Sequence, residues 1–286
     1  MEWFWLSLLA AFLWSIVNII DKHVIDRELK DPILCSISYT SAVFFVFLFS
    51  SLLLSKVDFG IESPISFAAG VIFGFAVYFY FKALRYGEIS RVIPLSMLGV
   101  LFVVMFALIF FGESLNLLNY IGIASLLLGA ILISYKKDRA GKKFVLFGLI
   151  SAMLFALRDI LTKWGMAASP LSVLFWIALG TLFYSLFMIA IHHPHLRKKM
   201  VSGVEHIFIV SFISAIALLV FVFAMSIGPL SLVRVAATSQ GLFVFILALF
   251  LSKTHPHIIK EEMRASIIER KLIAILLIIL GIALIA

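Results

Sequence analysis

The sequence has little charge and almost no cysteine. Only 13% of its 286 residues are charged, while 64% are apolar and the mean hydropathy is +1.18. Soluble globular chains are about 45–50% apolar and about 25% charged. A water-soluble fold of this size could not bury so much apolar surface, which excludes an ordinary soluble enzyme, a nucleic-acid-binding domain and a disordered chain. The single cysteine, Cys35, excludes an internal disulfide.

The chain also lacks the motifs of catalysis. No glycine-rich phosphate loop followed by Lys and Ser or Thr occurs, so ATP-driven function is not supported. Cys35 has no evident base partner, and we expect neither enzymatic activity nor a cofactor. Five histidines have a spacing that occurs in metal sites, but no acidic or cysteine ligand accompanies them. We interpret them as solvated loop residues: His192, His193, His195, His255 and His257.

Apolar segments fill most of the sequence instead. Ten of them are each about long enough to cross a membrane, which takes about 20 residues per helix. They span residues 3–21, 33–55, 65–84, 90–111, 117–135, 144–164, 170–191, 206–227, 230–251 and 271–286. Because backbone groups in lipid must bond to one another within the segment, these runs are predicted to be helices. We expect an all-α, multi-pass protein of the cell membrane, surrounded by lipid and without a nucleic-acid partner. The first segment is expected to be a retained helix, because it has no basic region before it.

A repeat appears when the sequence is shifted by 141 residues. Residues 11–23 then align with 152–164 with four identities, including Lys22 over Lys163. Residues 83–111 align with 224–252 with nine identities in 29 positions. One shift therefore aligns two separate stretches without gaps, and this predicts an internal duplication.

The duplication predicts two halves of five helices each, residues 1–137 and 142–286. Five is an odd number, so the second half would cross the membrane in the opposite sense to the first. Inverted repeats in transporters place the substrate path near the membrane midplane, between the halves. The sequence thus predicts ten transmembrane helices in two inverted five-helix repeats, with alternating access as the mechanism.

Several motifs resemble the drug/metabolite transporter superfamily, specifically its ten-helix EamA-type exporters. The segment Ala83–Leu95 (ALRYGEISRVIPL) is similar to the family's connection between helices three and four. The segments Phe111–Leu115 (FGESL) and Gly129–Ile133 (GAILI) resemble its glycine-glutamate turn and closing helix, and Gly281–Ile285 echoes that helix in the second half. The resemblance implies this fold and the export of a small metabolite.

The sequence departs from the family pattern at two places. At the 141 shift, Gly112 and Glu113 fall on Lys253 and Thr254, so the second half has no glycine-glutamate turn. The small multidrug relatives carry a glutamate in their first helix, where this sequence has Trp14. That replacement argues against proton-coupled export of cationic drugs by their mechanism.

Charges inside the predicted helices are rare, and such residues mark substrate or ion pathways. Arg158, Asp159 and Arg234 are expected at a similar depth, which allows a pair between Asp159 and Arg234. Arg158 and Asp159 are adjacent and are not expected to share one helix face. An arginine here would bind an anion or carboxylate and Asp159 would couple protons; the competing interpretations are a static ion pair or arginines that reach the interface.

Polar and aromatic side chains at mid-helix positions are the remaining candidates for the substrate path, with packing between helices as the alternative for each. The full set of predicted path residues is Trp14, Asn18, Tyr78, Lys82, Ser96, Arg158, Asp159, Trp176, Tyr184, Arg234 and Gln240. Gln240 is the strongest of the uncharged ones, because a buried amide must find a partner.

The formal charge of +8 is concentrated in alternate loops. The positive-inside rule then places those loops in the cytoplasm and both termini outside. The leading functional prediction is a secondary transporter, expected to be an exporter, of a small metabolite such as an amino acid. A lipid or lipid-linked sugar translocase is the alternative, and an intramembrane enzyme acting on lipid is a weaker one. Proton coupling and a homodimer are both compatible with the sequence.

Overall fold

The computed structural model describes residues 2–54, 59–134, 142–167, 169–192, 201–254 and 265–285. Within these ranges the regular structure is helical, as the composition predicts. The helices are α1 (Glu2–Arg27), α2 (Pro32–Leu54), α3 (Glu62–Tyr86), α4 (Ile89–Met97), α5 (Val100–Phe110), α6 (Leu117–Ser134), α7 (Lys142–Gly165), α8 (Pro170–His192), α9 (Val201–Ile227), α10 (Leu230–Ala237), α11 (Gln240–Thr254) and α12 (Ala265–Ile285). The predicted boundary between the two halves, at 138–141, lies outside the described residues.

Seven helical segments in the described part of the chain are long and apolar enough to cross a membrane. They are α1, α2, α3, α7, α8, α9 and the stretch Leu230–Thr254, which comprises α10 and α11. Large apolar side chains are exposed on the surface of the bundle, among them Phe49 of α2, Ile109 of α5 and Leu276 of α12, each more than 60% exposed. Soluble proteins rarely expose apolar patches of this extent, whereas such side chains suit a lipid environment.

Two of the predicted segments are interrupted. Between α4 and α5 the backbone hydrogen bonds join residues three apart instead of four. For example, the Leu101 amide donates to the Leu98 carbonyl. The same change separates α10 from α11, where the Leu242 amide donates to the Ser239 carbonyl. Short 3₁₀ stretches within a helix often mark a hinge.

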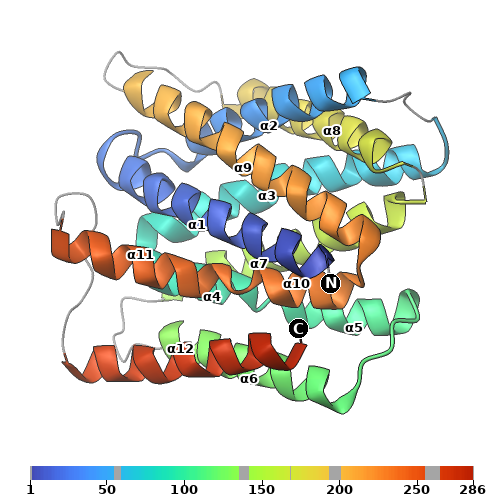
Figure 1. Ribbon diagram of the computed structural model, residues 1–286. Coiled ribbons are helices and arrows are strands. Elements are labelled where there is room, and N and C mark those ends of the chain that lie inside the picture. The colour runs from blue at the N-terminus through green and yellow to red at the C-terminus, as the bar shows by residue number, and fades with distance from the viewer. Residues whose placement is uncertain are drawn as a thin grey trace.

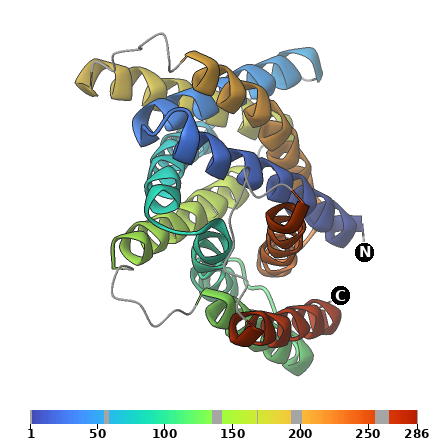
Figure 2. The same cartoon turned by 90° about the vertical axis from the view of Figure 1, so that its left-hand side faces the viewer.

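The helices pair mainly between the two halves of the chain. α1 packs on α9, α3 packs on α7 and α8, and α2 packs on α8 and α9. α6 and α12 lie side by side along one edge, where α6 also contacts α4 and α12 contacts α10 (Figures 1 and 2). The central core therefore consists of side chains that both halves contribute.

Close helix contacts require small residues. A Cβ atom on Gly180 of α8 would lie 2.1 Å from the Phe67 carbonyl oxygen and 2.9 Å from the Gly70 Cα of α3. A Cβ atom on Gly99 would lie 2.4 Å from the carbonyl oxygen of Ala152 in α7. Small residues allow membrane helices to approach closely where lipid provides no hydrophobic driving force.

Candidate functional site

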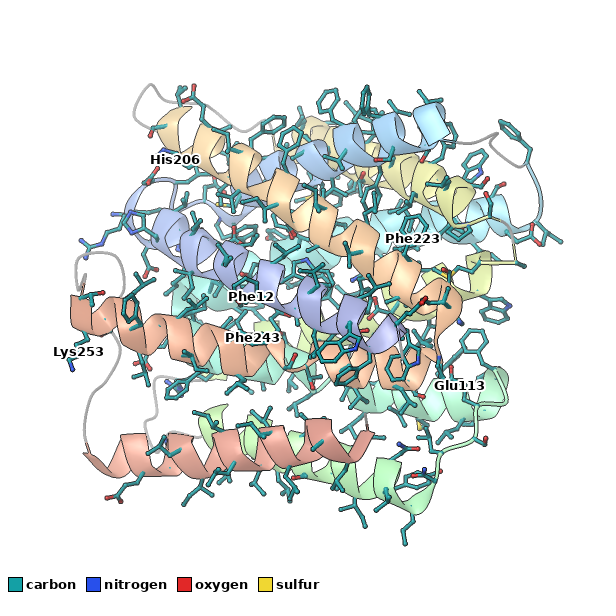
Figure 3. The ribbon with its side chains drawn as sticks, viewed as in Figure 1. Phe12, Glu113, His206, Phe223, Phe243 and Lys253 are labelled. Carbon is teal, nitrogen blue, oxygen red and sulfur yellow. The ribbon has the colours of Figure 1, made fainter. Side chains whose placement is uncertain are left out.

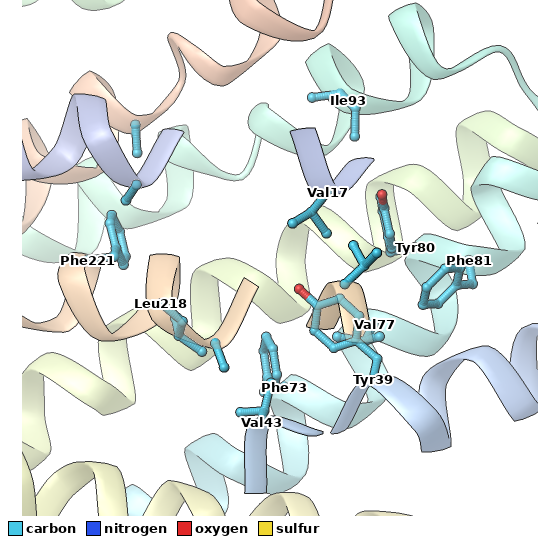
Figure 4. Packing of buried hydrophobic residues seen from close by; sticks show 14 of the residues in the cluster. Val17, Tyr39, Val43, Phe73, Val77, Tyr80, Phe81, Ile93, Leu218 and Phe221 are labelled. Carbon is cyan, nitrogen blue, oxygen red and sulfur yellow. The ribbon is translucent and has the colours of Figure 1, made fainter. Parts of the chain in front are cut away.

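A cavity of about 70 Å³ lies near the centre of the bundle. Both halves contribute to its wall, the first through α1, α2, α3 and α4, the second through α7, α10 and α11. The lining residues are Trp14, Asn18, Tyr39, Phe73, Val77, Tyr80, Ile93, Ser96, Phe155, Arg158, Arg234, Ala237, Thr238 and Gln240. Figure 4 shows the tyrosines and phenylalanines of this region, with Tyr39 and Tyr80 on one side and Phe221 on another. A wall that combines aromatic and aliphatic side chains with several polar groups is typical of a small-molecule site.

An ion cluster forms the most polar part of the wall. Asp159 is completely buried, and its two carboxylate oxygens contact two arginines. Arg158 Nη2 lies 3.1 Å from Asp159 Oδ1, and Arg234 Nε lies 3.1 Å from Oδ2. The predicted pair between Asp159 and Arg234 is confirmed. The reasoning that adjacent residues do not share a helix face did not anticipate the contact between Arg158 and Asp159, which the long arginine side chain makes.

The cluster carries a net charge of +1, since two guanidinium groups share one carboxylate. Arg158 is only 2% exposed, and its Nε and Nη1 atoms have no hydrogen-bond partner among the described residues. Its guanidinium carbon lies 5.2 Å from the ring centre of Phe73 and 5.9 Å from that of Phe155. Aromatic faces attract a cation at such distances. The arrangement thus holds a buried cation with two polar atoms free to bind an anionic group.

A second polar group lies on the wall contributed by the first half. The Tyr80 hydroxyl of α3 lies 2.8 Å from Asn18 Oδ1 and 3.2 Å from Asp21 Oδ2, both on α1. The predicted first segment ends at residue 21, whereas α1 continues to Arg27, so Asp21 lies inside the helix and is 1% exposed. Sequence reasoning missed Asp21, although its position three residues after Asn18 places both on one helix face.

Six of the predicted path residues line the cavity, and Asp159 forms ion pairs with two of them, Arg158 and Arg234. The six are Trp14, Asn18, Ser96, Arg158, Arg234 and Gln240. The sequence pattern did not single out Phe73, Val77 or Tyr80, because aromatic and branched residues are common throughout these helices.

Four predicted path residues lie elsewhere. Lys82 packs its ammonium over the ring of Tyr78, 4.7 Å from its centre, away from the cavity. Trp176 makes an edge contact with Phe59. Tyr184 is fully buried between helices, with its hydroxyl 2.8 Å from that of Ser36. These four predictions gain no support from the cavity.

Two lysines bind the ends of helices in the same way. Lys22 Nζ donates to the carbonyl oxygens of Leu84 at 2.7 Å and Gly87 at 2.9 Å, where α3 ends. It also forms an ion pair with Asp26. A lysine near the carboxyl end of a helix satisfies carbonyls that lack an intrahelical partner.

Lys163 repeats this contact at the end of α9. Its Nζ donates to the carbonyl oxygens of Met225 at 2.6 Å and Gly228 at 3.1 Å. Nearby, the Glu113 carboxylate accepts hydrogen bonds from the Ser231 amide and hydroxyl at the start of α10. A carboxylate at a helix amino end stabilises the unpaired amides there, so Glu113 links the two halves.

The described residues hold no group of three or more His, Cys, Asp or Glu side chains suited to a metal. His192, at the end of α8, is exposed. The other histidines predicted to be loop residues, His193, His195, His255 and His257, lie outside the described part of the chain. No metal site is proposed.

Comparisons with known proteins agree with the membrane fold. The model of the EamA-like transporter family matches residues 1–135. A curated Sinorhizobium sp. protein named "Uncharacterized transporter in cobO 3'region" is 44% identical over 55 residues, which are 19% of this chain and 39% of that protein. The match thus spans well under half of that relative's length.

A solved structure titled "Crystal structure of protein" shares the fold. It has a TM-score of 0.69 at 17% identity, covering 98% of this chain and 96% of the other. The EamA-like family is a family of transporters, which agrees with the prediction that the chain is not an enzyme. The chain is a multi-pass membrane protein whose residues 1–135 match the EamA-like transporter family.

Proposed function

We propose that the protein is a secondary transporter of a small, carboxylate-bearing metabolite such as an amino acid. The observation that carries this proposal is the central cavity, because both halves build it and it contains a buried cluster of net charge +1. Alternating access is the proposed mechanism, and export is the direction that the EamA resemblance suggests.

The two lysines support the internal duplication. Lys22 binds the carbonyls of residues 84 and 87, and Lys163 binds those of residues 225 and 228. Every one of these positions is related by the shift of 141 that aligns the sequence. Equivalent residues therefore make equivalent contacts, which two unrelated apolar segments would have no reason to do.

The ends of the repeat favour an inverted arrangement. At the same shift, Lys253 corresponds to Gly112, the neighbour of Glu113. Glu113 and Lys253 lie at opposite ends of the molecule (Figure 3), as expected when the halves cross the membrane in opposite senses. With α4–α5 and α10–α11 each counted as one interrupted span, the proposed number of transmembrane helices is ten.

The interrupted helices support a transport role as well. Substrate sites in transporters with inverted repeats are commonly formed by discontinuous helices near the midplane. Here Ser96 precedes one interruption, while Thr238 and Gln240 flank the other, and all three line the cavity. The interruptions would supply hinges beside the bound substrate.

The unpaired guanidinium nitrogens of Arg158 suggest that the substrate carries a negative charge. A carboxylate could accept hydrogen bonds from Nε and Nη1 while Asp159 keeps its own contacts. An apolar or aromatic remainder would pack against Trp14 and Phe73. Because the observed volume of about 70 Å³ is below the roughly 300–1,000 Å³ of typical ligand pockets, the helices must separate to admit such a solute.

Counterflow in proteoliposomes tests the proposal. The reconstituted protein is loaded with panels of amino acids, sugars, nucleosides or quaternary amines, with and without a pH gradient. Saturable exchange of carboxylate-bearing solutes is expected. Failure of every soluble compound to exchange, with correctly folded protein, would overturn the proposal and favour a lipid or lipid-linked sugar translocase.

A matched pair of variants locates the substrate contact. Charged hydrogen bonds contribute about 1.5–3 kcal/mol, so Arg158→Gln should raise the half-saturating concentration about 10- to 150-fold. Lys82→Gln removes a cation from a span without touching the cavity and should leave that concentration unchanged. Equal effects of the two substitutions would refute the assignment of the site.

A further inference from the structure

Asp21, unlike Asp159, forms no ion pair with the residues that the structure describes. Both carboxylates are buried, at 1% and 0% exposure. Asp159 contacts two guanidinium groups, whereas no lysine, arginine or histidine in the described residues lies within 4 Å of Asp21. The neighbouring Lys22 turns to Asp26 and to the end of α3.

The hydrogen bonds around Asp21 are incomplete. The Tyr80 hydroxyl has one proton and two acceptors in reach, Asn18 Oδ1 and Asp21 Oδ2, so it can donate to only one of them at a time. Asp21 Oδ1 and Asn18 Nδ2 have no partner in the described structure. Burying an unpaired ionised carboxylate costs far more than burying a neutral carboxyl group, so this site suits an aspartic acid that holds a proton.

Among the described residues, the groups that face this site are hydroxyl and thiol groups, which provide no compensating positive charge. α3 contributes the Tyr80 hydroxyl, and α2 contributes the buried side chains of Cys35 and Tyr39. α9 contributes Ser214, which is hydrogen-bonded to the Tyr39 hydroxyl.

Cations on the other helices packed against α1 have other contacts. Arg234 of α10 is engaged with Asp159. His206 of α9 lies against Glu28, beyond the site. Arg91 of α4 lies over the Phe144 ring, and Lys253 of α11 is exposed. Arg158 of α7 is paired with Asp159 as described above.

The site adjoins the substrate cavity. Asn18 and Tyr80 line the cavity and also contact each other beside Asp21. A change in the position of α1 against α3 would therefore alter the cavity wall and the surroundings of Asp21 together. This is the geometry that a coupled site requires, because loading of one site must affect the other.

We propose that Asp21 is the residue that carries the coupling proton, while the Arg158–Asp159–Arg234 cluster binds the anionic part of the substrate. This inference rests on the proposed transport function. A proton from water on one side of the membrane bonds to a carboxylate oxygen of Asp21 and gives the neutral acid. When the cavity opens to the other side, the same bond breaks and the proton returns to water. Asp159 keeps its two ion pairs throughout.

Infrared spectroscopy of the reconstituted protein tests the proton site without any substrate. The wild-type protein should show a protonated-carboxyl band that disappears as the pH rises. Asp21→Asn should abolish this band, whereas Asp159→Asn and the exposed Asp26→Asn should retain it. Persistence of the titrating band in Asp21→Asn, or its loss in Asp159→Asn, would overturn the assignment.

A transport assay then distinguishes a failure of the proposed proton site from a failure of the proposed transport function. In counterflow, Asp21→Asn should exchange the solute that the wild type exchanges, but without dependence on a pH gradient. If exchange by Asp21→Asn still depends on the pH gradient, the role of Asp21 is overturned. The same holds if exchange by the wild type depends on a sodium gradient and not on pH. Neither result would overturn the transport function. A wild-type protein that exchanges nothing would overturn the transport function first.

A second variant tests the proton site if Asp21→Asn does not fold. Tyr80→Phe removes one hydroxyl and keeps the ring, so it should fold and should move the pH midpoint of the carboxyl band. The same substitution at the buried but distant Tyr184 should leave the midpoint unchanged. An unaltered midpoint in Tyr80→Phe would contradict the proposed site.

Discussion

Replacement of Asp159 by Asn should destabilise the protein strongly. The carboxylate is fully buried and each oxygen lies 3.1 Å from an arginine nitrogen, so its loss leaves two guanidinium groups facing each other without an anion. Removing one partner of a buried ion pair costs about 3–5 kcal/mol. At about 2 °C per kcal/mol for a chain of this size, the Tm should fall by about 6–10 °C.

Thermal unfolding of the purified protein in detergent measures this change. Asp26→Asn is the control, because it removes a carboxylate from an exposed ion pair, which contributes about 0–1 kcal/mol. Adding Arg234→Gln to Asp159→Asn restores the original net charge and should recover part of the lost Tm. If Asp159→Asn costs no more than Asp26→Asn, the cluster does not stabilise the fold and the reasoning fails.

Three further predictions concern other parts of the molecule. Glu113→Gln should speed hydrogen exchange of the first amides of α10, measured by mass spectrometry, because it weakens the carboxylate contact with Ser231; unchanged exchange would refute this link between the halves. Gly180→Ala should cost about 1–3 kcal/mol in thermal unfolding, since its Cβ would meet the backbone of α3; a neutral effect would show that the helices separate easily. A reporter fused after the final residue should report an external carboxyl terminus, as the loop charges predict, and a cytoplasmic signal would reverse that orientation.

The sequence predicts the helical segments and the contact between Asp159 and Arg234, for identifiable reasons. Long apolar runs in lipid have few alternatives to helix, and charges within such runs must find partners. Arg234 and Asp159 were therefore expected to meet, and they do.

The remaining features depend on tertiary contacts. Hydropathy ends the first segment at Asp21 because charged residues follow, but packing extends α1 to Arg27 and buries the aspartate. The spacing of Tyr78 and Lys82 shows that they share a helix face, but it does not show which neighbour that face meets. The identity of Lys22 and Lys163 appears in the alignment, while their carbonyl contacts require the folded positions of α3 and α9.

Alternating access requires that the cavity open to each side of the membrane in turn. Ser96→Cys in a Cys35→Ser background places one thiol on the cavity wall and removes the buried native one. A membrane-impermeant thiol reagent, applied separately to each face of oriented vesicles, should label residue 96 from both sides, and an exchanged solute should slow the labelling. Labelling from one side alone, whatever solute is present, would contradict alternating access.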